Sequence, residues 1–387
     1  MVAKMGKEKN SIDIDKWIQL IRCDGIGPIG FARLLKYFGN IDDALGASVG
    51  KLEQVEGIGP KTAESILASR DKFDTAKEIQ LAEKLGVWII NLEDSRYPAA
   101  LKRIYDPPPV LYVKGTLKSS DALAVAIVGT RRCTTYGAEQ SSRLGYMLAS
   151  AGFTIISGMA SGIDTAAHLG AIKAAGRTIA VQGCGLATIF PPENKKLFAQ
   201  VADFGACISE LPLKFEARSE NFPARNRIIS GLSMGVIVVE SAAIGGAMIT
   251  ASAAVEQNRE VMAIPSRIDS PVSTGPHRLI KDGARLVHSI DDVMEALGYI
   301  GQGLREHASF AAAKAKEDVQ GSLFDVEQLN LSQTEKTVLK NLDFEHVHID
   351  DIISSTNLPA GEINSALICL RLKGLINQSP GNMFAKK

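Results

Sequence analysis

The side chains best suited to bind an anion lie in residues 222–233, which read FPARNRIISGLS. The apolar residues of this segment recur with helical spacing. Pro223 fits the first turn of that helix, because the N–H that proline lacks has no helical partner there. Arg225 and Arg227 therefore lie near the positive end of a helix dipole, where guanidinium groups suit phosphate. Two surface arginines held in salt bridges are the alternative interpretation, and the neighbouring sequences are needed to decide.

Composition limits what could bind there. The chain has 387 residues, 45% of them apolar, which predicts two or three domains with a substantial core. Its 43 basic and 43 acidic residues give zero net charge, so binding to nucleic acid must depend on local patches. Five scattered cysteines favour a reducing compartment over disulfides or a zinc site. No signal peptide and no apolar run of about 18 residues is present, so we expect a soluble, cytoplasmic protein without a membrane partner.

The elements that must position the arginines lie between residues 95 and 298. Apolar runs alternate there with helical stretches such as 138–151 and 163–175. Continuous apolar runs are typical of strands buried on both faces, and their alternation with helices predicts an α/β fold with a doubly wound, mainly parallel sheet. The runs occupy residues 124–128, 154–157, 178–181, 206–209, 236–239, 260–264 and 285–287.

Glycine-rich loops follow several of these runs, at the sheet edge where ligands bind in such folds. Glycine lets a phosphate approach the backbone, and N–H groups at helix starts can hold it. Arg131 and Lys195 add positive charge to the edge that carries Arg225 and Arg227. Strand-end glycines also make ordinary tight turns, but their joint occurrence with the cations predicts a groove for a polyanion.

Common catalytic arrangements are missing from this edge. Gly129 does not begin a GxGxxG fingerprint, and no P-loop or nucleophile elbow is present. His168 and His277 are isolated and no metal-ligand cluster occurs, so we expect no metal and no cofactor. Asp164 fits a helix cap as well as a ligand, and Glu210 fits a salt-bridge partner of the arginines.

Several short motifs follow one another along this region. They are YPAAL at 97–101, DPPPVLYVKG at 106–115, GTR at 129–131, SGMASGID at 157–164, PPEN at 191–194, SELP at 209–212 and FPARNRII at 222–229. In this order they closely resemble the DNA-processing protein A family, densely from residue 97 to residue 288 and more loosely in both flanks. The resemblance implies an extended Rossmann-like sheet that binds single-stranded DNA and has no known enzymatic activity. It further implies a mediator that protects incoming strands and loads the recombinase RecA during natural transformation.

The resemblance also implies roles for particular residues. Phosphate contacts are implied for Arg131, Lys214, Arg225 and Arg227, and backbone contributions for Ser157, Gly158 and Gly162. Together with the loops above, the predicted DNA- or phosphate-binding residues are Gly129, Thr130, Arg131, Ser157, Gly158, Ser161, Gly162, Lys195, Lys214, Phe222, Arg225, Asn226, Arg227 and Thr250. Family members form homodimers through the rear of the sheet domain, for which the candidates here are Val255, Ile280 and Leu286, although each also fits a core.

The sequence departs from the family pattern at a few positions. Phe190 stands where the family often has tyrosine, and it keeps the aromatic face that stacking on a base requires. Pro192 stands where some members have lysine, which leaves Lys195 to compensate. Residues 264–266 and 275–277 match the family only in part, which leaves the turns there open.

Two smaller domains are expected on the flanks of residues 91–298. Residues 1–90 carry GIGP at 25–28 and again at 57–60, a repeat that resembles a helix-hairpin-helix domain. Such turns either offer helix amides to DNA phosphates or serve packing and protein contacts, and both interpretations stay open. Residues 299–330 are expected to be a linker, and residues 331–387 a winged-helix domain. Its third helix has few cations before Arg371, which favours protein contacts or weak DNA binding.

Two further functions remain as alternatives. Residues 245–250 superficially resemble the PGGxGT motif of nucleotide N-glycosidases of the lysine-decarboxylase-like family, for which Glu240 would be a candidate catalytic carboxylate. That family has a catalytic glutamate shortly after the motif, whereas the first carboxylate here is Glu256. The third possibility is an interaction scaffold with a vestigial groove.

Overall fold

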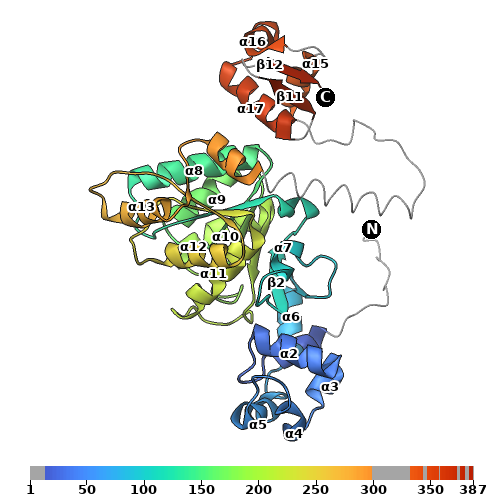
Figure 1. The fold of residues 1–387 in the computed structure, drawn as a ribbon. Coiled ribbons are helices and arrows are strands. Elements are labelled where there is room, and N and C mark those ends of the chain that lie inside the picture. Colours follow the sequence, from blue (N-terminus) through green and yellow to red (C-terminus); the bar gives the residue numbers. More distant parts are fainter. Residues whose placement is uncertain are drawn as a thin grey trace, which may run out of the picture.

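The computed structural model describes residues 14–298, 332–342, 347–356, 358–372, 375–379 and 383–386. Three parts follow one another along the chain: a small helical domain, a central sheet domain and a winged-helix domain (Figure 1). The helical and winged-helix domains lie at opposite ends of the sheet domain. The predicted linker, residues 299–330, falls outside the described residues.

The central domain is built on a nine-stranded sheet with the order β1-β2-β6-β5-β4-β3-β7-β8-β9. All neighbours from β6 to β9 in that order are parallel, whereas β1 pairs antiparallel with β2 and β2 antiparallel with β6. The strands are β1 (Val87–Asn91), β2 (Val110–Gly115), β3 (Ala124–Val128), β4 (Thr154–Ser157), β5 (Thr178–Val181), β6 (Ala206–Ser209), β7 (Gly235–Val238), β8 (Glu260–Ala263) and β9 (Arg285–Leu286). The predicted doubly wound, mainly parallel sheet is confirmed.

Helices cover both faces of this sheet, as its continuous apolar strands require. On β3, Val125 and Ile127 face a core with α8 and α9, while Ala124, Ala126 and Val128 face a core with α11 and α12. The helices of this domain are α7 (Ala99–Lys102), α8 (Thr135–Ser150), α9 (Ile163–Lys173), α10 (Lys195–Phe204), α11 (Asn221–Leu232), α12 (Gly246–Glu256) and α13 (Thr274–Lys281), followed by helical residues 290–298. Short 3-10 turns occur at Ser119–Ala122, Pro192–Asn194 and Pro271–Ser273.

The two antiparallel strands were not singled out by the sequence. β1 directly follows a helix and is only five residues long, and a short apolar run does not by itself distinguish strand from helix. Its pairing with β2, from Val87 opposite Lys114 to Asn91 opposite Val110, is what makes it a strand. The sheet therefore begins at residue 87, inside the region expected to be helical.

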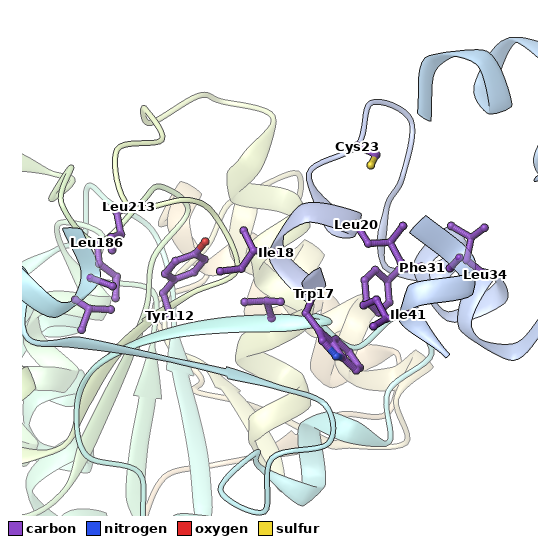
Figure 2. Packing of buried hydrophobic residues seen from close by; sticks show 14 of the residues in the cluster. Trp17, Ile18, Leu20, Cys23, Phe31, Leu34, Ile41, Tyr112, Leu186 and Leu213 are labelled. Atoms are coloured by element: carbon purple, nitrogen blue, oxygen red, sulfur yellow. The ribbon is translucent and has the colours of Figure 1, made fainter. Parts of the chain in front are cut away.

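The N-terminal domain consists of α1 (Ile14–Ile21), α2 (Pro28–Phe38), α3 (Ile41–Leu45), α4 (Val49–Leu52), α5 (Pro60–Ser69) and α6 (Thr75–Leu85). Gly25 and Gly57, at the start of the two GIGP turns, have φ values of 86° and 82°, which favour glycine. One continuous core joins this domain to the sheet domain: Trp17 and Ile18 of α1 lie in the same cluster as Tyr112 of β2 and Leu213 (Figure 2). The helical domain is thus packed on the sheet domain through apolar contacts.

The C-terminal domain has the predicted winged-helix elements. They are α15 (Gln333–Lys340), β10 (Val347–His348), α16 (Ile349–Thr356), α17 (Ala360–Leu372), β11 (Ile376–Ser379) and β12 (Met383–Lys386), with the strand order β10-β12-β11. Ser332 and Glu335 form the expected capping box at the start of α15. Among the described residues, no helix is both long and apolar enough to cross a membrane.

Candidate nucleic-acid interface

The candidate site lies where the chain changes direction along the sheet. β3 lies between β4 and β7 in the sheet, and the chain continues from β3 to β4 on one side and later returns to β7 on the other. A topological switch point therefore lies between β3 and β7. The loops after these strands are joined by a bond from the Thr130 N–H to the Glu240 carbonyl oxygen, 2.7 Å long. Gly162, with φ of 82°, lies so close that a Cβ there would be 2.5 Å from the Thr130 carbonyl oxygen. The loops at this edge therefore pack against one another through backbone.

An open groove of about 420 Å³ runs beside these loops. Its lining residues are Arg131, Phe190, Ala217, Ser219, Phe222, Pro223, Asn226, Gly246 and Ile249. The rings of Phe190 and Phe222 lie 5.5 Å apart, and the Arg131 guanidinium lies 5.0 Å from the Phe222 ring. The groove thus combines two aromatic rings, an exposed cation and the start of α11.

Other predicted residues extend this edge without lining the groove. Lys195, at the start of α10, and Lys214, in the loop after β6, are exposed. Ser161 donates a hydrogen bond from its hydroxyl to the Glu193 carboxylate, 3.0 Å away. Two further exposed cations are therefore available in addition to Arg131, and Glu193 adds a negative charge beside Ser161.

Arg225 has a different environment from the one predicted. Arg225 is only 6% exposed. Its Nη1 donates hydrogen bonds to the Gly158 carbonyl oxygen, 2.7 Å away, and to the Val181 carbonyl oxygen. The pKa of Arg225 is lowered to about 10, because burial lowers it by more than the nearby Asp164 raises it. The prediction that Arg225 clamps a phosphate must be corrected for this conformation, because its donors hold the ends of β4 and β5 together.

Gly158 explains why this buried arginine fits. A Cβ at Gly158 would lie 2.6 Å from a guanidinium nitrogen of Arg225, so a larger residue there would displace the guanidinium from its position. Asp164, also buried, accepts hydrogen bonds from the N–H groups of Gly158 and Ala160, and burial raises its pKa. Arg225 and Asp164 therefore hold the loop after β4 in place through hydrogen bonds to its backbone.

Arg227 is also engaged within the protein. Its Nε lies 2.8 Å from Asp106 and its Nη2 lies 2.7 Å from Glu210. The salt-bridge role suggested for Glu210 is confirmed by this contact. The Nη1 of Arg227 has no hydrogen-bond partner but is buried, so the phosphate contact of Arg227 stays a prediction.

The remaining predicted residues divide between support and lining. The Ser157 hydroxyl is buried and donates to the Ile127 carbonyl oxygen, and Thr250 is buried in the first turns of α12. Asn226 lines the groove and donates from Nδ2 to the Gly246 carbonyl oxygen, 3.1 Å away, which links α11 to α12. Ser157 and Thr250 are thus not presented to the groove.

Glu240 does not have the position that a catalytic carboxylate needs. It is 1% exposed, and its carboxylate accepts hydrogen bonds from the N–H of Thr134, at 2.8 Å, and from the Thr134 hydroxyl, at 2.5 Å. Both contacts are at the N-terminal end of α8, so Glu240 anchors that helix. These contacts give Glu240 a supporting position and do not favour the alternative of a nucleotide N-glycosidase that uses it. Among the described residues, no group of three or more potential metal ligands is present.

The sequence did not indicate Ala217, Ser219 or Ile249 as lining residues. Ala217 and Ser219 lie in the irregular segment between β6 and α11, and Ile249 is an exposed apolar residue on α12. Small side chains in a loop carry no sequence signal for binding. Only the exposure of Ile249, which the sequence does not show, distinguishes it from the buried residues of the same helix.

Comparison with known proteins covers all three parts of the chain. A family model described as DNA recombination-mediator protein A matches residues 88–298. Models described as a DprA-like N-terminal HHH domain and a DprA winged helix domain match residues 13–58 and 325–382. These matches confirm the family resemblance and the nature of both flanking domains, and the family comprises DNA-binding mediators without a known enzymatic activity.

Individual relatives agree with these models. Protein Smf of Synechocystis sp. is 33% identical over 395 residues, which cover 96% of this chain and 98% of that protein. DNA processing protein DprA of Streptococcus pneumoniae is 38% identical over 268 residues, covering 68% of this chain and 90% of the relative. The X-ray structure of DprA from Streptococcus pneumoniae has a TM-score of 0.64 at 34% identity and covers 73% of this chain and 97% of that one.

Proposed function

Because the chain belongs to the DNA recombination-mediator protein A family, we propose that it binds single-stranded DNA in the groove beside Arg131 and acts as a recombination mediator. In this role it protects incoming strands and loads RecA onto them during natural transformation. It works in the cytoplasm as a homodimer and catalyses no covalent step.

The observation that carries this proposal is the pairing of Phe190 and Phe222 beneath an exposed arginine. A base offers its ring face to an aromatic side chain only when it is unstacked, as in a single strand. Arg131 and the rings together match one nucleotide, with the base against the rings and its phosphate against the guanidinium. Duplex DNA keeps its bases stacked and cannot fill the groove in this way.

The exposed cations extend the site beyond one nucleotide. Lys195 and Lys214 belong to neighbouring loops at the carboxyl edge of the sheet and remain accessible. Contacts of this type are to phosphates, so they carry little sequence preference and depend on salt. Arg225 and Arg227 contribute by holding the loops in place.

The test is a salt titration of binding to a labelled 50-mer, single-stranded or duplex. Arg131→Ala should weaken binding to the single strand about tenfold and reduce the log–log salt slope by about 0.7, the share of one phosphate. Phe222→Ala should weaken binding by a similar factor without changing the slope, because stacking releases no counterions.

Arg132→Ala is the matched control, because Arg132 is exposed and adjacent but does not line the groove. Equal effects of Arg131→Ala and Arg132→Ala would show that only total charge matters. Absence of binding to the single strand at low salt would refute the proposal. The RecA step is checked separately by whether this protein shortens the lag of RecA filament assembly on coated strands.

A further inference from the structure

The segment 210–220 connects β6 to α11 and lines part of the groove. It contains Lys214, supplies the lining residues Ala217 and Ser219, and leads to Phe222 in the first turn of α11. One side of it is held within the sheet domain by two backbone bonds of 2.9 Å, from the Gly185 N–H to the carbonyl of Phe215 and from the Ala187 N–H to the carbonyl of Leu213.

The first part of this segment is also held by the N-terminal helical domain. Arg22, immediately after α1, donates from Nη2 to the Glu210 carbonyl oxygen at 2.5 Å. Glu78, on α6, accepts a hydrogen bond from the Leu213 N–H at 2.7 Å. Two charged side chains from different helices thus fix the backbone on either side of Leu211 and Pro212.

Glu78 is buried, at only 8% exposed, and Arg22 is partly buried. The Nε atom of Arg22 and the hydroxyl of the fully buried Tyr112 of β2 are buried without a hydrogen-bond partner, so the polar contacts of Arg22 are those made by its Nη2. Burial lowers the pKa of Arg22, and Tyr112, Glu210 and Glu78 raise it. Placing such charges in an interior is unfavourable unless their hydrogen bonds are made. Apolar packing alone would dock the domain without them.

The contacts continue from Glu210 to the helix that begins the groove. The Glu210 carboxylate binds Arg227 of α11, and Arg227 also binds Asp106. Phe222 lies at the start of that same helix. The backbone of Glu210 is therefore held by the helical domain, while its side chain holds α11.

We infer that Arg22 and Glu78 are positioning residues through which the N-terminal helical domain sets the loop 210–220 for DNA binding. This inference rests on the proposed function of the groove. It assigns the domain a role that requires no contact with DNA: it orders the loop before the strand arrives, so less conformational freedom is lost on binding. The two domains share an apolar core (Figure 2), so we expect them to stay joined when either polar contact is removed.

The test compares substitutions at Glu78 in the full-length protein. Glu78→Ala removes the acceptor for the Leu213 N–H and should weaken single-strand binding about tenfold. Glu78→Gln keeps an acceptor oxygen and should restore most of the affinity. Glu83→Ala, an exposed carboxylate on the same helix, is the control for charge and should leave the affinity within twofold of the unchanged protein.

Hydrogen exchange separates positioning from a general loss of structure. In Glu78→Ala the amides of Leu213 and Ala187 should exchange at least tenfold faster, while amides of β3 keep their protection. Arg22→Leu, which removes the donor to Glu210 but keeps an apolar stem, is a second variant with the same expected result. Lys36→Ala, which removes an exposed cation from the same domain, should change neither readout.

Unchanged affinity and unchanged exchange in both Glu78→Ala and Arg22→Leu would overturn the inference, as would faster exchange throughout the sheet. If the unchanged protein fails to bind single strands, the proposed function fails instead. In that case the exchange of Leu213 and Ala187 still decides whether the helical domain orders the loop.

Discussion

Arg131 and Arg225 are both arginines of the candidate site, but they have different roles. Arg131 is exposed over the Phe222 ring, whereas Arg225 is buried under the loop after β4. The exposed guanidinium is available to a ligand. The buried one donates to the backbone carbonyls of Gly158 and Val181, and its charge offsets that of Asp164. Accessibility therefore separates the binding arginine from the supporting one.

This difference predicts opposite consequences of mutation. Arg225→Ala should lower the free energy of unfolding by about 3–5 kcal/mol, because it leaves a buried carboxylate and two carbonyls uncompensated. Arg131→Ala, at an exposed position, should change it by less than about 0.5 kcal/mol. Urea unfolding of both variants measures the contrast. Full stability of Arg225→Ala, together with lost DNA affinity, would instead support direct phosphate contact.

At the scale of elements, α9 is tied to β4 and β5 by a buried polar contact. His168 is fully buried, and its Nδ1 lies 2.7 Å from the Thr178 hydroxyl, which itself donates to the Ile155 carbonyl oxygen. The histidine must therefore donate from Nδ1, and its buried Nε2 has no hydrogen-bond partner. A proton on Nε2 would be both buried and unpaired.

This contact predicts a loss of stability in acid. Burial, together with the nearby charge of Arg225, lowers the pKa of His168 from 6.5 to about 3. Between these values the unfolded chain binds a proton that the folded chain does not, so the free energy of unfolding falls as pH falls. From pH 7 to pH 5 this residue should account for a loss of about 2 kcal/mol.

His168→Asn keeps a donor for Thr178 and does not titrate. The expected result is a shallower loss of stability between pH 7 and pH 5 than in the unchanged protein, measured by urea unfolding at each pH. Carboxylates that titrate in the same range affect both proteins equally. The same pH dependence in both would show that His168 does not carry the effect.

At the scale of the whole molecule, the proposed dimer belongs to the β9 edge of the sheet. β9 is paired only with β8 in the described sheet, and Leu286 within it is exposed. Val255 on α12 is exposed as well, and Ile280 on α13 is partly exposed. A strand edge without a partner and exposed apolar side chains are both suited to pairing with a second copy.

Leu286→Glu should therefore shift the protein from dimer to monomer, with a dissociation constant at least tenfold higher, because it places a charge in an apolar contact. Sedimentation equilibrium measures this shift. Leu169→Glu, at a similarly exposed leucine on α9, is the matched control and should leave the dimer intact. A monomer before mutation, or dissociation caused equally by both substitutions, would refute this interface.

The sequence by itself determined the alternation of strands and helices, the parallel sheet and the edge at which its loops gather. Those features follow from local periodicity and from the glycines in the loops after strands, such as Gly158 and Gly162. Both signals are local, so they can be read without knowing how distant segments pack. The capping box of Ser332 and Glu335 is equally local, and the structure contains it.

Only the tertiary structure decided what each charged residue does. Arg225 and Arg227 are separated by a single residue in the sequence. Arg225 is nevertheless buried against β4 and β5, whereas Arg227 pairs with Asp106 and Glu210. Their partners lie far away in the chain, and burial depends on how those distant segments pack. The same holds for Arg22 and Glu78, which reach a loop more than 130 residues away and have no local pattern that reveals it.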